Sequence, residues 1–84
     1  MIPDNNIKKY RIENGITQTC LSSLTGISLA MIQALEQGNR KLYDGSVRNL
    51  IRISGVLRVD PMDLLDWQVI NIKECEGYVY DPDE

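Results

Sequence analysis

Three glycines divide the first half of the chain into short segments, and each follows a stretch whose apolar residues have helical spacing. They are Gly15, Gly26 and Gly38. Glycine readily takes the left-handed backbone conformation that closes a helix. Thr17 and Ser28 follow two of these glycines and can accept hydrogen bonds from the first turn of the next helix. The pattern therefore predicts three consecutive short helices, the first of which begins at position 5 or 6.

Two more helices are expected in the second half of the chain. The first runs from Ser46 to Leu57, and the second begins with Asp60 as its cap and Pro61 at the first helical position. Five short helices predict an all-α domain, which is what a chain of 84 residues can accommodate. The inner stripe expected for the helix over 46–57 consists of Val47, Leu50, Ile51, Ser54 and Leu57.

The last part of the chain differs in composition from the predicted helices. Residues 1–67 contain all five helices and are expected to form one domain, and residues 68–84 form an acidic C-terminal extension. Residues 68–73 contain β-branched side chains, and residues 77–80 form a second short run of this kind. This composition is compatible with one strand or a hairpin.

The net charge of −3 is the sum of two opposite regions. Residues 1–59 hold eight basic and four acidic side chains, whereas residues 60–84 hold one basic and eight acidic side chains. The first region therefore carries +4 and the second −7. The acidic total does not exclude a nucleic-acid partner, because a basic module with an acidic appendage produces the same sum.

Several function classes are excluded by residues that the sequence lacks. It contains no histidine, which removes imidazole acid–base catalysis and histidine metal ligands. Cys20 and Cys75 lie far apart and form no CxxC pair, so a structural zinc site is not expected. No enzyme activity, cofactor, metal or small-molecule ligand is expected. The start of the chain is not a signal peptide and no run is long enough to span a membrane, so we expect a cytoplasmic protein. Two free thiols are expected in a reducing cytosol, and a single disulfide is the alternative.

Two charged residues share stripes with apolar residues. Arg11 lies on the stripe of Ile7 and Tyr10, and Glu36 lies on the stripe of Ile32. A charge that faces a core is costly unless it is paired. We therefore expect a bidentate ion pair between Arg11 and Glu36 that joins the first helix to the end of the third; the alternative is that both point outward at the edge of their stripes.

The second and third predicted helices have the spacing of a helix-turn-helix. Gln18 to Gln37 reads as helix, a turn at Gly26, and helix. The residues that carry the wider pattern are Ile7, Arg11, Gly15-Ile16-Thr17-Gln18, Leu21-Ser22, Gly26-Ile27-Ser28, Ile32, Leu35-Glu36, Gly38, Leu50, Ile53, Leu57, Val59, Pro61 and Leu64-Leu65. In this order they resemble the Cro/CI-type (XRE, lambda-repressor-like) family, over residues 6–66. The resemblance implies a five-helix lambda-repressor-like DNA-binding domain and also implies the Arg11–Glu36 pair.

The resemblance further implies a sequence-specific transcriptional regulator, a dimeric repressor whose partners are double-stranded DNA and a second copy of the chain. Its third helix, Ser28–Gln37, would read the major groove. The residues expected at the DNA backbone are Thr17, Gln18, Asn39, Arg40 and Lys41. The residues expected at the bases are Ser28, Leu29, Ala30, Gln33 and Ala34.

The expected reading face departs from many relatives, which carry polar side chains where this chain has Leu29 and Ala30. Apolar groups can contact thymine methyl groups, and Gln33 can bind adenine through its amide. An apolar edge also suits a protein partner. The alternative is therefore a protein-interaction module on the same fold, such as an antitoxin-like or phage-derived regulator with weak or no DNA binding.

Overall fold

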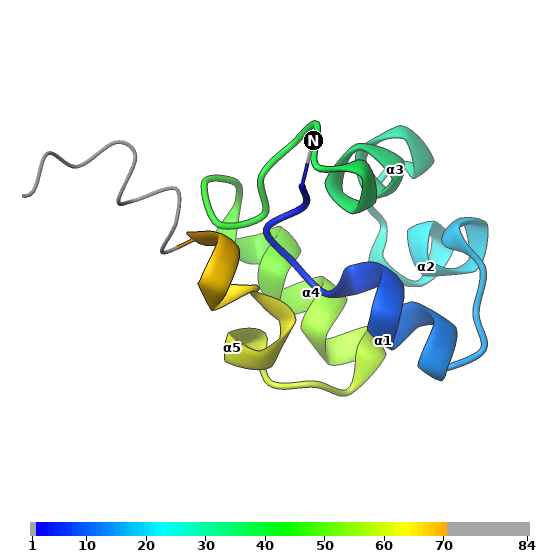
Figure 1. The fold of residues 1–84 in the computed structure, drawn as a ribbon. Helices are drawn as coiled ribbons and strands as arrows, with labels where there is room; N and C mark the ends of the chain where they lie inside the picture. Colours follow the sequence, from blue (N-terminus) through cyan, green and yellow to red (C-terminus); the bar gives the residue numbers. More distant parts are fainter. Residues whose placement is uncertain (1, 71–84) are drawn as a thin grey trace, which may run out of the picture.

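The computed structural model describes residues 2–70, which form an all-helical domain (Figure 1). Within this part of the chain, a sixth helical segment at 67–70 follows the five helices, and Asn5 and Leu65 form an isolated bridge but no strand. The predicted all-α class is confirmed. The helices are α1 (Ile7–Glu13), α2 (Gln18–Thr25), α3 (Leu29–Gln37), α4 (Val47–Leu57) and α5 (Pro61–Leu64).

The ends of the helices follow the capping residues of the sequence. The hydroxyl of Thr17 accepts a hydrogen bond from Cys20 N at 3.0 Å, and the hydroxyl of Ser28 accepts from Met31 N at 3.2 Å. The glycines at 15, 26 and 38 all have positive φ, as a left-handed helix end requires. These local signals place the starts of α2 and α3 within a residue of the predicted positions.

The core lies where α1, α2, α3 and α4 meet and is closed by α5. Ile7, Leu21, Ile32, Ile53 and Leu57 are buried at its centre. Ile32 and Leu57 come from predicted inner stripes. Helices this short are unstable in isolation, so the burial of apolar side chains between them stabilises the fold.

The stripe predicted for α4 is partly wrong. Val47 is 72% exposed and Ile51 is 54% exposed, whereas Ile53 is buried. Positions 50, 53, 54 and 57 form the inward stripe, so the helix is rotated about its axis relative to the expectation. Leu50, Ser54 and Leu57 keep their expected inward orientation, whereas Val47 and Ile51 are exposed on the outward side of the helix.

The predicted strand or hairpin begins in a segment that is helical. Residues 68–70 belong to the helical segment 67–70, and Ile70 is buried against the core. The buried side chain explains the difference, because a helical turn places Ile70 over the domain. The remainder of the expected strand and hairpin, residues 71–84, lies outside the described residues.

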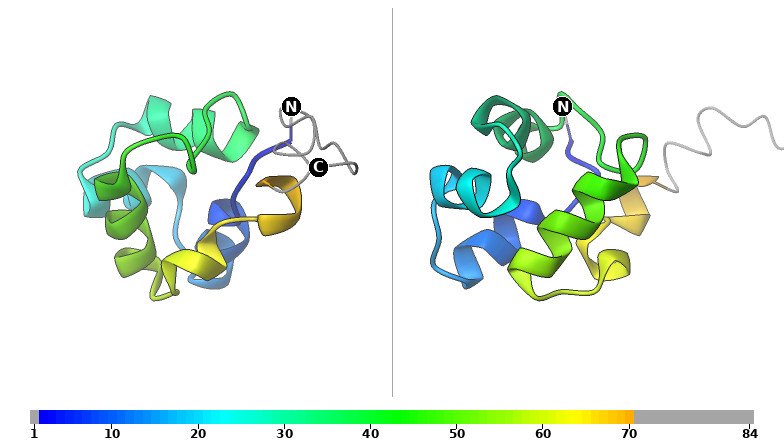
Figure 2. Two further views of the ribbon diagram at one scale, coloured as in Figure 1. Left: turned by 90° about the vertical axis from the view of Figure 1, so that its left-hand side faces the viewer. Right: turned by 180° about the vertical axis from the view of Figure 1, so that it is seen from behind.

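Residues 2–6 form an extended segment, here called the N-terminal strap, which runs between the α3–α4 loop and α5 (Figures 1 and 2). Asn6 N donates to Leu64 O at 2.7 Å, and the side chain of Asn5 donates to Leu35 O at 3.0 Å. Asn5 also accepts from Ile7 N at 3.2 Å, so it caps α1 with its side chain although Asn6 occupies the cap position. The strap thereby joins α1, α3 and α5.

Gly38 is where the strap comes closest to the end of α3, and we predict that Gly38→Ala lowers the free energy of unfolding by about 3 kcal/mol. The residue has φ +85°, and an added Cβ would lie 2.8 Å from backbone atoms of both Ile2 and Pro3. Gly15→Ala is the matched control, because Gly15 has φ +67° but nothing within 4 Å of an added Cβ. It should cost about 1 kcal/mol. Urea unfolding of both variants measures the difference, and equal losses would show that the close approach is unimportant.

Candidate nucleic-acid interface

The turn between α2 and α3 satisfies its own polar groups. Gly26 N donates to Ser22 O, and the hydroxyl of Ser22 donates to Ile27 O. Thr25 accepts from Ile27 N at 3.2 Å, and Ile27 is buried beneath the turn. Because these bonds use groups that a tight turn leaves unpaired, the turn itself contributes to a fixed crossing of the two helices.

Arg11 and Glu36 form the bidentate ion pair predicted from their stripes. Arg11 Nε lies 2.8 Å from Glu36 Oε2, and Arg11 Nη2 lies 3.1 Å from Glu36 Oε1. The side chains are 12% and 3% exposed. The hydrogen bonds to Glu36 raise the pKa of Arg11 above its ordinary value, against the opposing effect of burial. Arg11 Nη1 also donates to Ile16 O at 3.0 Å, so the pair fixes α1, the start of α2 and α3 to one another.

The outward side of α3 carries the residues predicted to read bases. Ser28, Leu29, Ala30 and Gln33 are exposed, and Ala34 is half-buried at the edge of this face. Leu29 is 37% exposed. Ile32, Leu35 and Glu36 lie on the opposite, buried side of the same helix. The helix therefore presents the face of Leu29, Ala30 and Gln33 to solvent while its other face is fixed in the core.

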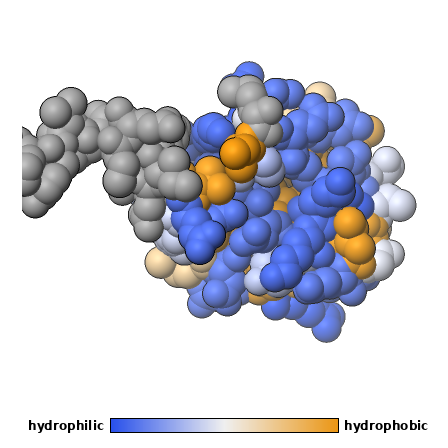
Figure 3. Space-filling view, in the orientation of Figure 1, coloured by the Kyte–Doolittle hydropathy of each residue, from blue (hydrophilic) through white to orange (hydrophobic). Residues whose placement is uncertain are grey.

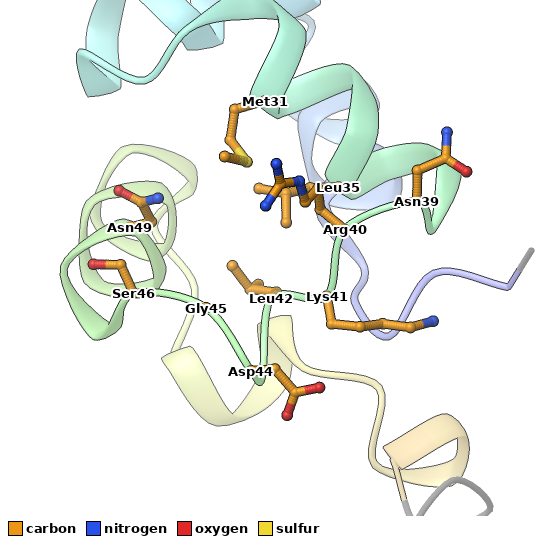
Figure 4. A pocket seen from close by; sticks show the side chains of 10 residues that line it. All are labelled: Met31, Leu35, Asn39, Arg40, Lys41, Leu42, Asp44, Gly45, Ser46 and Asn49. Atoms are coloured by element: carbon orange, nitrogen blue, oxygen red, sulfur yellow. The ribbon is translucent and has the colours of Figure 1, made fainter.

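The loop after α3 brings the predicted backbone-binding residues Asn39, Arg40 and Lys41 beyond the end of that helix. Lys41 Nζ donates to Ile2 O at 3.1 Å, and Asn39 donates to the side chain of Gln37 at 3.0 Å. Figure 4 shows Arg40 extending into a hollow between α3 and α4, whereas Lys41 points away from it. Two cations thus leave the same loop in different directions.

The hollow beside Arg40 has a volume of about 400 Å³. Its floor is apolar, with Met31, Leu35 and Leu42, and polar groups of the loop and of the first turn of α4 form its rim (Figure 4). Ser46 begins α4 without a hydrogen bond from its side chain to the helix. The hollow therefore separates two backbone segments, the α3–α4 loop and the start of α4, that carry exposed polar groups.

Residues 6–69 match the family model of the Cro/C1-type HTH DNA-binding domain. The chain belongs to this family. No curated protein matches the sequence. The helix-turn-helix of such a domain binds DNA, and the family is non-catalytic. The lambda-repressor-like fold inferred from the sequence is thereby confirmed, and the match extends three residues beyond the predicted segment of resemblance.

In this Cro/C1-type domain, Gln18 has a partner that the sequence did not predict. Its Nε2 donates to Glu36 Oε1 at 3.2 Å, so the amide extends the Arg11–Glu36 pair. Gln18 nevertheless lies at the first position of α2, where backbone N–H groups lack an intrahelical acceptor. Thr17 uses its hydroxyl to cap that helix. An amide–carboxylate contact thus holds the start of α2 against α3, beside the first-turn backbone N–H groups of α2.

Other residues that bear on this Cro/C1-type surface were missed at the level of sequence. Arg52 of α4 lies beside the turn, since a Cβ on Gly26 would be 3.7 Å from its guanidinium. Asp4 is buried against the α3–α4 loop. A lone arginine and a lone aspartate carry no pattern that could have placed them, because their neighbours are distant in sequence.

In the described residues no cluster of potential metal ligands occurs, and no helix there is long and apolar enough to cross a membrane.

Proposed function

We propose that this domain is a sequence-specific transcriptional regulator that places α3 in the major groove of DNA. The observation that carries the proposal is the outward face of α3, which is free while Ile32, Leu35 and Glu36 fix the opposite side. Gln33 is the central side chain of this face that can bind adenine through two hydrogen bonds. Leu29, Ala30 and Ala34 suit thymine methyl groups, and Ser28 can bond to a base edge or a phosphate at the start of the helix. We therefore expect a site rich in A·T pairs.

Contacts to the DNA backbone are assigned to both flanks of α3. On one flank, the first-turn N–H groups of α2 beside Thr17 and Gln18 favour a phosphate through the helix dipole. On the other flank, Arg40, Lys41 and Asn39 supply charge and hydrogen-bond donors. The Gln18–Glu36 contact supports this assignment because it fixes the start of α2 relative to α3. Binding through these groups should weaken steeply as salt rises.

A single domain offers Gln33 and a few apolar or small side chains to the bases, and so few contacts can read only a short sequence. We therefore propose that the protein acts in the cytoplasm as a homodimeric repressor on two half-sites about 34 Å apart, one helical turn of DNA. Such spacing follows from two-fold symmetry, because each copy then meets the same side of the duplex.

Selection from a pool of random duplexes at low salt tests the proposed function. The expected result is enrichment of an inverted repeat with A·T-rich half-sites, bound about 1000-fold more tightly than unrelated duplex. Scrambling one half-site is the control and should remove most of the gain. A chain that binds no duplex, or all duplexes equally, contradicts the proposal.

A protein-interaction module is the second candidate, supported by the exposure of Leu29 on α3. Against this candidate, Figure 3 shows one side of the molecule as largely hydrophilic, with small separate apolar patches rather than a continuous one. The exposed apolar side chains are also spread over several helices, including Ile12, Leu24 and Val47. Failure of the selection together with capture of a protein through Leu29 would favour this candidate.

A further inference from the structure

We propose that Asp4 is a positioning residue for DNA binding, which acts by holding the α3–α4 loop in the shape that presents its cations to the DNA backbone. The inference rests on the proposed function, since Asp4 would position residues that are proposed to bind the DNA backbone. Asp4 lies in the N-terminal strap, and its side chain contacts the loop over residues 39–43.

The Asp4 carboxylate holds two consecutive backbone N–H groups of the loop. Oδ1 accepts from Leu42 N at 2.9 Å, and Oδ2 accepts from Tyr43 N at 2.9 Å. The side chain of Asn5 donates to the same Oδ1 at 3.1 Å, and Asp4 is only 1% exposed. Bonds from N–H groups to a carboxylate are stronger than neutral ones. Because each oxygen holds a different peptide, the carboxylate fixes both the position and the orientation of the loop backbone.

The strap meets the loop at two further points, one on each side of Arg40. The backbone of Ile2 and Pro3 packs against Gly38, and Ile2 O accepts from Lys41 Nζ. Arg40 therefore lies in a short span that is held before it and after it. With its ends fixed, this span loses less conformational entropy when it binds a phosphate.

The strap is itself anchored to the end of α5 and to the residue that follows Leu65. Asp4 O accepts from Asp66 N at 2.9 Å, and Asn6 N donates to Leu64 O. The described contacts thus run from the end of α5, through the strap, to the loop that carries Arg40 and Lys41. An asparagine at position 4 would offer one acceptor oxygen to two donors and would direct an NH₂ group at one of them. Only a carboxylate satisfies both.

The test compares Asp4→Asn with the parent chain on the selected duplex, at a temperature where circular dichroism shows both to be folded. We expect about a 10-fold loss of affinity and a salt slope smaller by about one or two phosphate contacts. Asp4→Glu keeps the charge but moves it by one methylene, and it carries the same expectation should Asp4→Asn not fold. Asn14→Ala is the control, because it removes hydrogen bonds to Tyr10 O and Leu57 O away from the loop. It should leave the salt slope unchanged.

A thermodynamic cycle separates positioning from general destabilisation. In a chain that carries Arg40→Ala and Lys41→Ala, Asp4→Asn should change DNA affinity by less than about 2-fold, because the groups it positions are gone. An equal loss in both backgrounds, or an unchanged salt slope in folded Asp4→Asn and Asp4→Glu, overturns the inference. If the parent chain binds no duplex, the proposed function fails as well; if it binds and position 4 is neutral, this inference alone fails.

Discussion

Replacing Arg11 with alanine is expected to lower the free energy of unfolding by about 3–5 kcal/mol. The change leaves the Glu36 carboxylate, whose side chain is 3% exposed, with Gln18 as its remaining described partner. It also removes the bond from the guanidinium to Ile16 O. A domain of this size has about 5–10 kcal/mol in total, so the variant should be partly unfolded at moderate temperature.

Urea unfolding followed by circular dichroism measures this loss. Lys8→Ala is the matched control, because Lys8 lies on α1, is exposed and should change stability by less than about 0.5 kcal/mol. The loss of stability in Arg11→Lys should lie between those of the two alanine variants, since an ammonium keeps the charge but cannot form the bidentate contact with Glu36. An Arg11→Ala chain within about 1 kcal/mol of the parent would show that the buried pair contributes little.

Replacing Ala30 with glutamate is expected to lower affinity for the selected duplex by about 100-fold or more while leaving the domain folded. Ala30 is exposed in the first turn of α3, on the face proposed to enter the major groove. A carboxylate there would lie among phosphates and base acceptor groups. The same carboxylate near a helix N-terminus is favourable to the helix, so loss of stability cannot explain the effect.

Gly55→Glu provides the control of equal charge for Ala30→Glu. An added Cβ at Gly55 meets nothing within 4 Å, and the position lies on α4 rather than on α3. Its effect on affinity should stay below about 3-fold, since the charge acts only through screened, long-range repulsion. Fluorescence anisotropy with the selected duplex measures both variants. Equal losses for the two would mean that net charge, rather than the α3 face, controls binding.

The fold was predictable where a residue type acts on its immediate neighbours or carries a chemical demand of its own. Gly26 and Gly38 end helices through their own backbone freedom. Arg11 and Glu36 share stripes with apolar residues, and because an unpaired buried charge is costly, each is expected to pair with the other. The rotation of α4 was not predictable, because Val47 and Ile51 differ from inward residues only in what packs over them.

The candidate site was predictable as a face and not as a set of contacts. The outward residues of α3 follow from the helical period once Ile32 and Leu35 are placed in the core. The hydrogen bonds between Asp4 and the loop were not predictable, because the donors are backbone N–H groups more than 30 residues away. Every residue except proline has such a group, so the sequence does not single out the partners. The partner of Gln18 was likewise not predictable, because Glu36 lies 18 residues away and only the fold brings it to the amide.

The most direct measurement maps amide chemical shifts of the full chain during titration with the selected duplex. A major-groove reader of the kind proposed should show its largest shifts at residues 28–34, with further shifts at residues 17–18 and 39–43. Residues on the outward side of α4, such as Val47 and Ile51, should change little. Large shifts confined to α4 or α5, with an unperturbed α3, would contradict the assignment of α3 as the helix that reads DNA.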